Sequence, residues 1–385
     1  MELILKQYDI PLLRFSATND SSTPEIEVHW INEDQRHLLP LDMELSPEGI
    51  SRWMRRRTIP RNRAYVNRLL AKCGLNINRP MGILALCKGL SVDDSYWVVE
   101  EGFEGTFEKY NLFENRFSEV LALIAFTGYG SSNRSSLASS PEFTTNGMLP
   151  KCWRRISGKV TLYKGGTDGG YNTGAEPYCE YYAAQVAAAM GIDAIPYGLS
   201  QWKGRLCSTC ELFTDIDHAY MPIGNLVQRG GFDAVAAYYE NLGEPFQKAF
   251  RDMLVFDAVI CNTDRHYGNF GFMIDNKTNT IAAPAPLFDH GNSLFNQAGP
   301  EDYESPEAFQ QYIDTLVPCV YDDFFATAKR FMTDENREQL RKLLGFRFKR
   351  HVRYNLPPKR LKLMEEQVRK RAMRLLESKK PSITL

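Results

Sequence analysis

Alternating apolar and polar residues open the chain and predict a few strands within residues 1–45, as in the stretch IEVHWI. From Ser46 onward the apolar residues recur at helical spacing instead. A capping serine followed by Pro47 marks the start of this region, Pro60 interrupts it and Gly74 ends it. We therefore expect two helices here, and a further helix over ENRFSEVLALIAFTG.

A stretch rich in serine and glycine, YGSSNRSSLASSPEFTTNG, comes next and predicts a loop or linker. After it, the pattern predicts strands over about 152–164, a helix over about 177–190, and a hairpin that turns at Lys203 and Gly204. This second region therefore contains both strands and helices.

The pattern divides the chain into three parts. Residues 1–130 hold strands followed by helices, and residues 131–214 form a mixed unit. Residues 215–385 are mainly helical apart from a short hairpin near 270–288. We therefore predict an α+β protein with an additional N-terminal α/β region.

A short polar cluster, NTDRHYGN, interrupts the helical third part. It separates Asp264 from Asn269 by four residues, the spacing of phosphotransferase catalytic loops. In such a loop the aspartate orients an attacking hydroxyl, and the asparagine offers a neutral oxygen to a magnesium ion on the nucleotide phosphates. By itself the cluster is equally well explained as a structural turn. His266 is better explained as a brace for the loop than as an acid or base.

A second carboxylate follows the cluster. The stretch FGFMIDNKTNTIAAPAPLFDHG predicts a hairpin that turns at 276–279 and returns the chain to Asp289 and Gly291. Because the two ends of a hairpin lie side by side, we expect Asp289 beside the polar cluster. Together with Asn269 it would complete a magnesium site, which favours the catalytic interpretation.

The chain also offers a lysine and a glutamate of the kind that a kinase needs. In GKVTLYKGGT, Lys164 shares one face of a strand with Val160 and Leu162. An inward lysine needs an anionic partner, and Glu180 lies on the apolar face of the helix over 177–190. We predict that the two side chains pair. The alternative is that Lys164 ends an edge strand and Glu180 lies in solvent.

Composition narrows the class of protein. The 46 basic and 47 acidic residues nearly cancel, which argues against a protein that coats nucleic acid. No run approaches the roughly 20 apolar residues that cross a bilayer, so we expect a cytoplasmic protein without a membrane span. The eight cysteines are too few for a disulfide scaffold, and no second pair completes a zinc site with Cys207 and Cys210.

A basic stretch runs from Arg52 to Lys72 and contains eight Lys or Arg residues and no Asp or Glu. A pair of helices that binds nucleic acid is one interpretation. We favour the other, a solvated face whose charge is balanced by acidic residues elsewhere.

Six motifs in order resemble the HipA family of bacterial serine/threonine kinases across about residues 140–330. They are TTNGMLPKCW, LYKGG, EPYCEYYAAQVAAAMGI, CELF, NTDRHYGNFGF and LFDHG. The D-R-H-x-x-N run is also similar to phosphoinositide kinases. The resemblance implies a two-lobed protein-kinase-like fold that uses ATP and Mg²⁺, with residues 131–214 as the N-lobe and residues 215–385 as the C-lobe.

The resemblance also implies roles for single residues. Asp264 would be catalytic, together with Lys164 and Glu180, and Asn269 and Asp289 would hold the metal. TTNGMLPK would be the phosphate-binding loop, and the CELF segment would be the hinge that holds adenine. The residues implied in nucleotide binding are Thr144, Thr145, Asn146, Gly147, Lys151, Lys164, Glu211, Phe213 and His266.

We therefore expect a kinase that phosphorylates serine or threonine in a protein substrate. A lipid or small-molecule kinase with the same site stays open, as does a non-catalytic module associated with nucleic acid. The resemblance implies an antitoxin or other regulatory partner, although residues 1–130 do not resemble the small N-terminal subdomain of HipA. We also predict self-phosphorylation at Thr144 or Thr145; the alternative is that these side chains only cap a turn.

Overall fold

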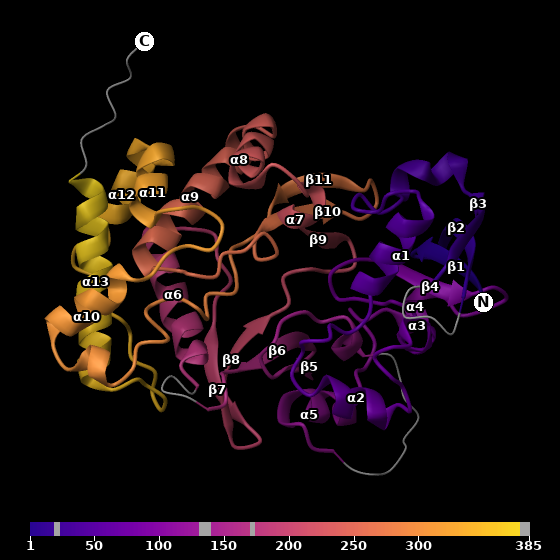
Figure 1. Cartoon of the computed structure of the whole chain (residues 1–385), viewed down its shortest axis with the longest axis horizontal. Helices are drawn as coiled ribbons and strands as arrows, with labels where there is room; N and C mark the ends of the chain where they lie inside the picture. The colour runs from indigo at the N-terminus through magenta and orange to yellow at the C-terminus, as the bar shows by residue number, and fades with distance from the viewer. Residues whose placement is uncertain (19–23, 131–139, 170–173, 378–385) are drawn as a thin grey trace. The chain divides into compact units, whose positions relative to one another are not determined.

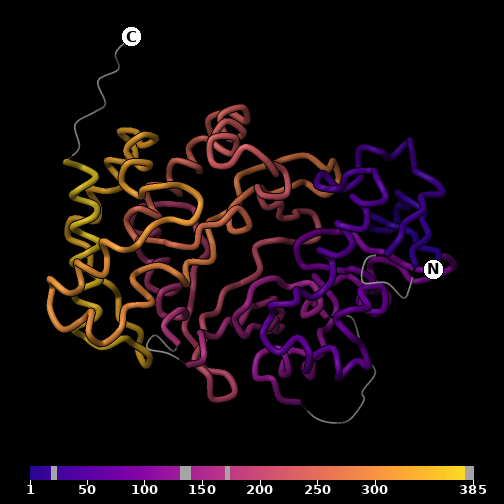
Figure 2. The backbone as a smooth tube through the Cα atoms, viewed as in Figure 1, coloured from indigo at the N-terminus to yellow at the C-terminus, as the bar shows by residue number. Residues whose placement is uncertain are grey.

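The computed structural model describes residues 1–18, 24–130, 140–169 and 174–377, so residues 131–139 of the loop or linker predicted at 129–147 lie outside the described residues. The chain forms two compact units, each assembled from several stretches of sequence. Figure 2 traces the backbone of both. The first unit comprises Met1–Lys164, Glu211–Met221 and Met273–Ala282, and the second comprises Gly165–Cys210, Pro222–Phe272 and Ala283–Leu385.

A four-stranded antiparallel sheet in the order β3-β2-β1-β4 begins the first unit (Figure 1). Its strands are β1 (Glu2–Gln7), β2 (Ile10–Ala17), β3 (Ile26–Ile31) and β4 (Tyr96–Glu100). The alternation in β1 places Leu3 and Leu5 in a core that also contains Trp53 and Leu84 from two helices. Burial of these side chains fixes the register of the sheet, because a slip of one residue would expose them.

Short helices complete the N-terminal part of the first unit. They are α1 (Pro47–Arg56), α2 (Val66–Lys72), α3 (Pro80–Cys87), α4 (Phe107–Tyr110) and α5 (Glu119–Thr127), with 3-10 turns at Glu33–Leu38 and Pro141–Phe143. The predicted helix start is confirmed, because the Ser46 hydroxyl accepts a hydrogen bond from the backbone N–H of Gly49 at 3.1 Å. The predicted break at Pro60 separates α1 from α2.

The basic stretch was predicted to be a solvated face. This prediction is wrong for two of its arginines, which are buried. Arg57 forms an ion pair with Asp94, and Arg63 forms one with Glu142; both arginines are buried. The acidic partners lie 37 and 79 positions away in the chain. The sequence pattern carries no signal for such distant pairs.

Two further strands, β5 (Lys151–Ile156) and β6 (Lys159–Gly165), pair antiparallel and place Lys151 opposite Lys164. A second core joins Trp153 and Val160 of these strands to Trp97 and Phe107. The strands that carry the predicted phosphate-binding residues therefore share a core with the N-terminal region. A three-stranded sheet in the order β11-β10-β9 has the strands β9 (His218–Pro222), β10 (Gly271–Asp275) and β11 (Thr280–Pro284).

The second unit is mainly helical, with one β-hairpin. The hairpin pairs β7 (Gly198–Trp202) with β8 (Arg205–Glu211) around the predicted turn at Lys203 and Gly204. The helices are α6 (Glu176–Met190), α7 (Ile223–Leu226), α8 (Gly231–Asn241), α9 (Glu244–Ile260), α10 (Pro306–Asp314), α11 (Phe324–Phe331), α12 (Asp334–Arg341) and α13 (Pro358–Leu376), with a 3-10 turn at Glu301–Tyr303.

Helix α9 is the structural centre of the second unit. Every residue from Asp252 to Ile260 is buried, and the helix packs against α6, α8, α11 and α13 (Figure 1). The chain leaves this helix directly into the predicted catalytic loop, so the loop begins from a rigid base. None of the described helices has both the length and the apolar character that spanning a membrane requires.

Candidate active site

The predicted catalytic loop is tied to the buried end of α9. The helix ends at Cys261, whose backbone is left-handed with a φ of 54°. The next residue, Asn262, donates a side-chain hydrogen bond to Asp257 at 3.2 Å and accepts one from the backbone N–H of Asp264 at 3.1 Å. One buried amide thereby sets the direction in which the loop leaves the helix.

Arg265 is the centre of a buried network. Its guanidinium forms a bidentate ion pair with Asp257, with both N–O distances 3.0 Å, and the two side chains are 1% and 0% exposed. It also donates to the carbonyl oxygens of Asn269 at 3.2 Å and Phe288 at 2.6 Å, and its Nη2 lies 3.0 Å from Nδ1 of His290. One side chain therefore joins the catalytic loop to the FDHG segment.

Burial and charge act in opposite directions on this arginine. Burial favours loss of its proton, but the Asp257 carboxylate raises the pKa of Arg265 above its ordinary value. The guanidinium remains charged, and all of its hydrogen bonds are charge-assisted.

Asp264 is half-buried, and its carboxylate is held by an amide. Nδ2 of Asn292 donates to Oδ2 of Asp264 at 2.8 Å, and Oδ1 of Asn292 accepts from Asn296 at 2.9 Å. The second bond fixes which side of the Asn292 amide faces the aspartate. Because the donor is neutral, it orients the carboxylate without cancelling its charge.

Asn269 lies at the other end of the loop and bonds back to its start. Its side-chain N–H donates to the backbone oxygen of Asp264 at 3.1 Å, and its backbone N–H donates to the carbonyl of His266 at 2.9 Å. The amide nitrogen is thus used within the loop, and the amide oxygen is the atom that can bind a metal ion.

Asp289 adopts a left-handed backbone, with a φ of 56°. Such a conformation costs a non-glycine residue about 1–3 kcal/mol and persists where its surroundings enforce it. The N–H of Asp289 donates to the Tyr197 hydroxyl at 3.1 Å, and the N–H of His290 donates to Glu180 at 2.7 Å. Burial, reinforced by the Glu180 charge, raises the pKa of Tyr197 well above its ordinary value, so the hydroxyl stays neutral.

Glu180 is fully buried on α6, as its place on the apolar face predicted. The bond to His290 is a role that the sequence did not indicate. Lys164 is buried on β6 and belongs to the first unit, whereas Glu180 belongs to the second. The pairing of these two side chains therefore stays a prediction.

His266 is exposed at the tip of the catalytic loop. Its Nδ1 accepts the backbone N–H of Gly268 at 3.0 Å. This contact is the bracing role predicted for the histidine.

The predicted phosphate-binding loop lies in the first unit, and the hydroxyls of both of its threonines form hydrogen bonds. The Thr144 hydroxyl is 4% exposed and donates to the carbonyl of Leu90 at 3.0 Å. The Thr145 hydroxyl donates to the carbonyl of Pro141 at 2.7 Å and accepts from the Trp153 ring N–H at 2.9 Å. The Thr145 hydroxyl thus caps the preceding turn, as the alternative interpretation proposed, whereas the Thr144 hydroxyl joins the loop to a segment 54 positions earlier in the chain.

Gly147 and Lys151 shape the end of the same loop. Gly147 has a φ of 96°, and a Cβ there would lie 2.1 Å from Nζ of Lys151. That ammonium group donates to the carbonyl of Asn146 at 2.8 Å. The backbone conformation therefore favours glycine at this position, and a side chain there would displace the Lys151 ammonium group.

The two predicted hinge residues also lie in the first unit. Glu211 forms an exposed ion pair with Lys159 at 2.7 Å, and the ring of Phe213 meets Tyr220 edge-on at 5.5 Å. The backbone N–H of Leu212 donates to Val160 at 2.9 Å, so this segment runs along β6.

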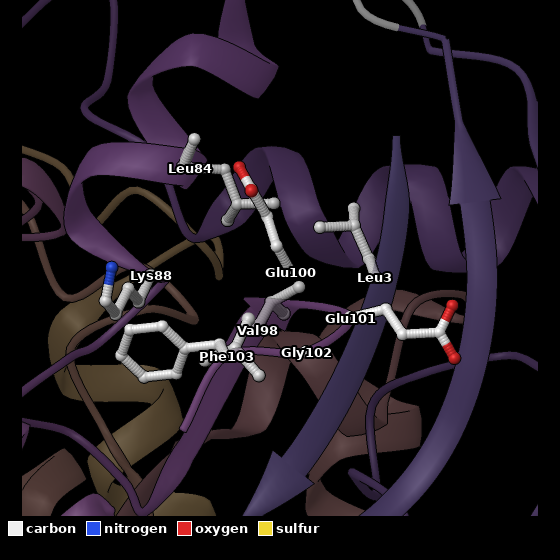
Figure 3. A pocket seen from close by; sticks show the side chains of 10 residues that line it. Leu3, Leu84, Lys88, Val98, Glu100, Glu101, Gly102 and Phe103 are labelled. Carbon is white, nitrogen blue, oxygen red and sulfur yellow. The ribbon is translucent and has the colours of Figure 1, made fainter. Parts of the chain in front are cut away.

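Two of the hollows on the described surface lie in different units of the chain. One, of about 550 Å³, is lined by Tyr267 of the catalytic loop and by residues 317–322. Burial and then the Asp264 charge raise the pKa of Cys319 in its wall to about 11. The other, of about 310 Å³, lies between α3 and β4, where Lys88 approaches the Phe103 ring at 4.7 Å (Figure 3). The second hollow contains none of the predicted site residues.

Sequence reasoning missed three residues that shape the site. Asn292 lies three positions beyond Asp289, so an amide close to the predicted metal ligand was available as a signal. Arg265 lies within the NTDRHYGN cluster, but its role depends on Asp257, which lies eight positions earlier on α9. Nothing in the sequence around Tyr197 indicates its contact with Asp289.

No family model matches the chain. The chain is 27% identical over 135 residues to the serine/threonine-protein kinase CtkA of Helicobacter pylori, a match that covers 31% of this chain and 41% of the relative. The chain thus spans less than half the length of the curated relative that it matches.

Two solved structures are similar to this chain. The crystal structure of the H. pylori proinflammatory kinase CtkA has a TM-score of 0.48 and 16% identity, covering 60% of this chain and 90% of that one. A chain in the complex of HipA, HipB and operator DNA from Shewanella oneidensis MR-1 has a TM-score of 0.51 and 12% identity, covering 98% of this chain and all of that one. The second likeness confirms the predicted HipA-like, kinase-like α+β fold.

Proposed function

We propose that this chain, which has the HipA-like kinase fold, transfers the γ-phosphoryl group of ATP to a serine or threonine hydroxyl of a protein. The observation that carries the proposal is that the Arg265 side chain binds both the catalytic loop and the segment that precedes Asp289. Its guanidinium binds the carbonyl of Asn269 and the carbonyl of Phe288, the residue before Asp289. Asp264 precedes Arg265 in the chain, so one buried side chain organises all three predicted residues of the chemical step.

Asp264 is the residue assigned to the acceptor hydroxyl. Asn292 binds its Oδ2, and Oδ1 is the atom that we assign to the hydroxyl proton. An oriented carboxylate of this kind positions the attacking oxygen in line with the phosphoryl group.

Asn269 and Asp289 fit a magnesium ion. Magnesium, when bound with the nucleotide, would neutralise charge that develops on the phosphates. The side-chain oxygens of Asn269 and Asp289 are the hard ligands that this ion prefers, and it takes its other ligands from water and phosphate. The described residues contain no cluster of three or more His, Cys, Asp or Glu side chains that could hold a metal. The proposed site has one carboxylate, from Asp289, and one amide, from Asn269, so it is not a cluster of that kind.

A protein acceptor is proposed because the curated relative is a serine/threonine-protein kinase. The same site chemistry would serve a lipid or small-molecule hydroxyl. A partner such as the HipB antitoxin of the similar complex is likewise a proposal. Two arginines of the basic stretch are occupied in buried ion pairs, which weakens the case for a nucleic-acid-binding module. A cytoplasmic location stays a prediction.

Self-phosphorylation of the loop also stays a prediction. The Thr144 hydroxyl is buried against Leu90, so phosphorylation there requires that the segment first leave its place. A phosphate would add about −1.5 to −2 charges and could not return to a buried carbonyl.

The test of the proposed function is transfer of label from γ-labelled ATP with Mg²⁺ and a cell extract, followed by a gel and a lipid extraction. Wild-type protein should label protein bands, and Asp264→Asn should abolish that label. Asp233→Asn, which changes an exposed carboxylate, is the matched control and should retain activity. Label confined to the lipid fraction would reject the protein acceptor, and the absence of label from every fraction would reject the kinase.

A further inference from the structure

Arg63 of the basic stretch contacts both ends of the predicted phosphate-binding loop. Its Nη1 donates to the carbonyls of Glu142 at 2.7 Å and Thr145 at 3.0 Å. Its Nη2 donates to the carbonyl of Lys151 at 3.1 Å and forms the ion pair with the Glu142 carboxylate. The loop between Thr145 and Lys151 is therefore closed across a single guanidinium.

Further contacts attach the same loop to its surroundings. The other carboxylate oxygen of Glu142 accepts the backbone N–H of Trp153 in β5 at 2.8 Å. The backbone N–H of Ala64, next to Arg63, donates to the carbonyl of Met148 at 3.1 Å. The loop is thus held at its start, its middle and its end by Arg63, Ala64 and the residues that they contact.

The ion pair lies in a fully buried environment, with Arg63 1% and Glu142 0% exposed. Burial raises the pKa of Glu142, and the Arg63 charge opposes that effect. A buried ion pair adds little stability over well-packed apolar side chains, so its presence points to a requirement for a particular geometry. A planar guanidinium can bind a carboxylate and three carbonyls at once, which the single ammonium of lysine cannot do.

We infer that Arg63 is a positioning residue that holds the phosphate-binding loop in the shape that accepts the nucleotide phosphates. The inference rests on the proposed function. Lys151 is held at its backbone by Arg63 and, through its ammonium group, at the carbonyl of Asn146. Loss of the guanidinium would remove the hydrogen bond to the carbonyl of Lys151 at the start of β5, and we expect the ammonium group to shift with the backbone.

The test compares Arg63→Lys with Arg57→Lys. Arg57 is a matched control because it is also buried, binds Asp94 in a bidentate pair and donates to the carbonyls of Gly89 and Tyr96. These hydrogen bonds of Arg57 go to residues outside the loop. The measurements are the thermal unfolding midpoint, MgATP affinity by calorimetry, steady-state kinetics, and hydrogen exchange of residues 142–151.

Both variants should unfold at a lower temperature than wild type. Only Arg63→Lys should weaken MgATP binding, by about tenfold, and raise KM for ATP by a similar factor with a smaller change in kcat, because ground-state and transition-state binding of the phosphates are lost together. Hydrogen exchange over residues 142–151 should quicken in Arg63→Lys and stay unchanged in Arg57→Lys.

Equal MgATP affinity and KM in the two folded variants would overturn the inference and leave the proposed function standing. Faster exchange in Arg63→Lys without a change in affinity would also overturn it, because the arginine would then only stabilise the loop. If wild-type protein itself bound no nucleotide, the proposed function would fail and this inference with it.

Discussion

Arg265 holds the candidate active site together by charge and by hydrogen bonding at once. Replacing it with methionine would leave the Asp257 carboxylate buried without a partner, since both side chains are almost fully buried. We expect Arg265→Met to lower the free energy of unfolding by about 3–5 kcal/mol, measured by urea denaturation. Arg330→Met removes an exposed pair with Asp233 and should cost no more than about 1 kcal/mol. Equal losses in the two variants would contradict the role given to the network.

Asp93 predicts a pH dependence of stability. Burial, with a contribution from the charge of Asp94, raises its pKa from 3.8 to about 6. The folded state therefore binds this proton more tightly than the unfolded state does. The contribution of this protonation to the free energy of unfolding is fully present below about pH 4. It is lost as the pH rises through about 6.

Asp93→Asn should remove this dependence, because an amide does not titrate and can still accept the hydrogen bond from Ser91. In urea denaturation the variant should be more stable than wild type at pH 7.5, and the difference should shrink as the pH falls to 5. A difference that is constant across this range would show that Asp93 does not titrate as described.

We propose that nucleotide binding depends most directly on the loop between Asn146 and Lys151. Gly147→Ala would push a Cβ into the Lys151 ammonium group, whereas Gly158→Ala, at a φ of 86°, has open space around it. Both substitutions strain a left-handed backbone by about 1–2 kcal/mol. Only Gly147→Ala should weaken MgATP binding in calorimetry, because only it displaces Lys151. Equal affinities would remove this loop from the nucleotide site.

Elements with local signals were predictable from sequence. The start of α1 follows from Ser46 and Pro47, the hairpin of β7 and β8 from the turn at Lys203 and Gly204, and the strand over β6 from alternation around Lys164. Each signal lies within a few residues of the element that it predicts.

Elements and contacts that join distant segments were not predictable from the same pattern. Strand β4 enters the N-terminal sheet by pairing Val98 with Leu5, and no local signal fixes that partner. The contact of Tyr197 with Asp289 spans 92 positions, and that of Arg63 with Glu142 spans 79. The residues that we propose for the chemical step could be selected from the sequence because their spacing is that of a phosphotransferase catalytic loop. Their supporting contacts depend on the packing of the whole chain and leave no such spacing.

The first unit cannot be divided at the predicted linker without cutting a core. Trp97 and Phe107 lie on one side of residues 131–139, and Trp153 and Val160 lie on the other. We expect a fragment of residues 140–385 to be insoluble when expressed alone, because it exposes two apolar strands. Co-expression with residues 1–130 should restore a soluble pair that copurifies. A soluble 140–385 fragment with the unfolding midpoint of the full chain would show that the N-terminal region is separable.

The central claim is that Asp264 serves the acceptor while Asp289 serves the metal and nucleotide. The most direct test is calorimetric titration with ATP of three proteins: wild type, Asp264→Asn and Asp289→Asn. Each protein is titrated once in the presence of Mg²⁺ and once in the presence of EDTA. Asp264→Asn should bind MgATP within about threefold of wild type and transfer no phosphate, because its carboxylate acts only on the acceptor. Asp289→Asn should lose the part of the affinity that depends on Mg²⁺. Identical binding profiles for the two variants would contradict the assignment.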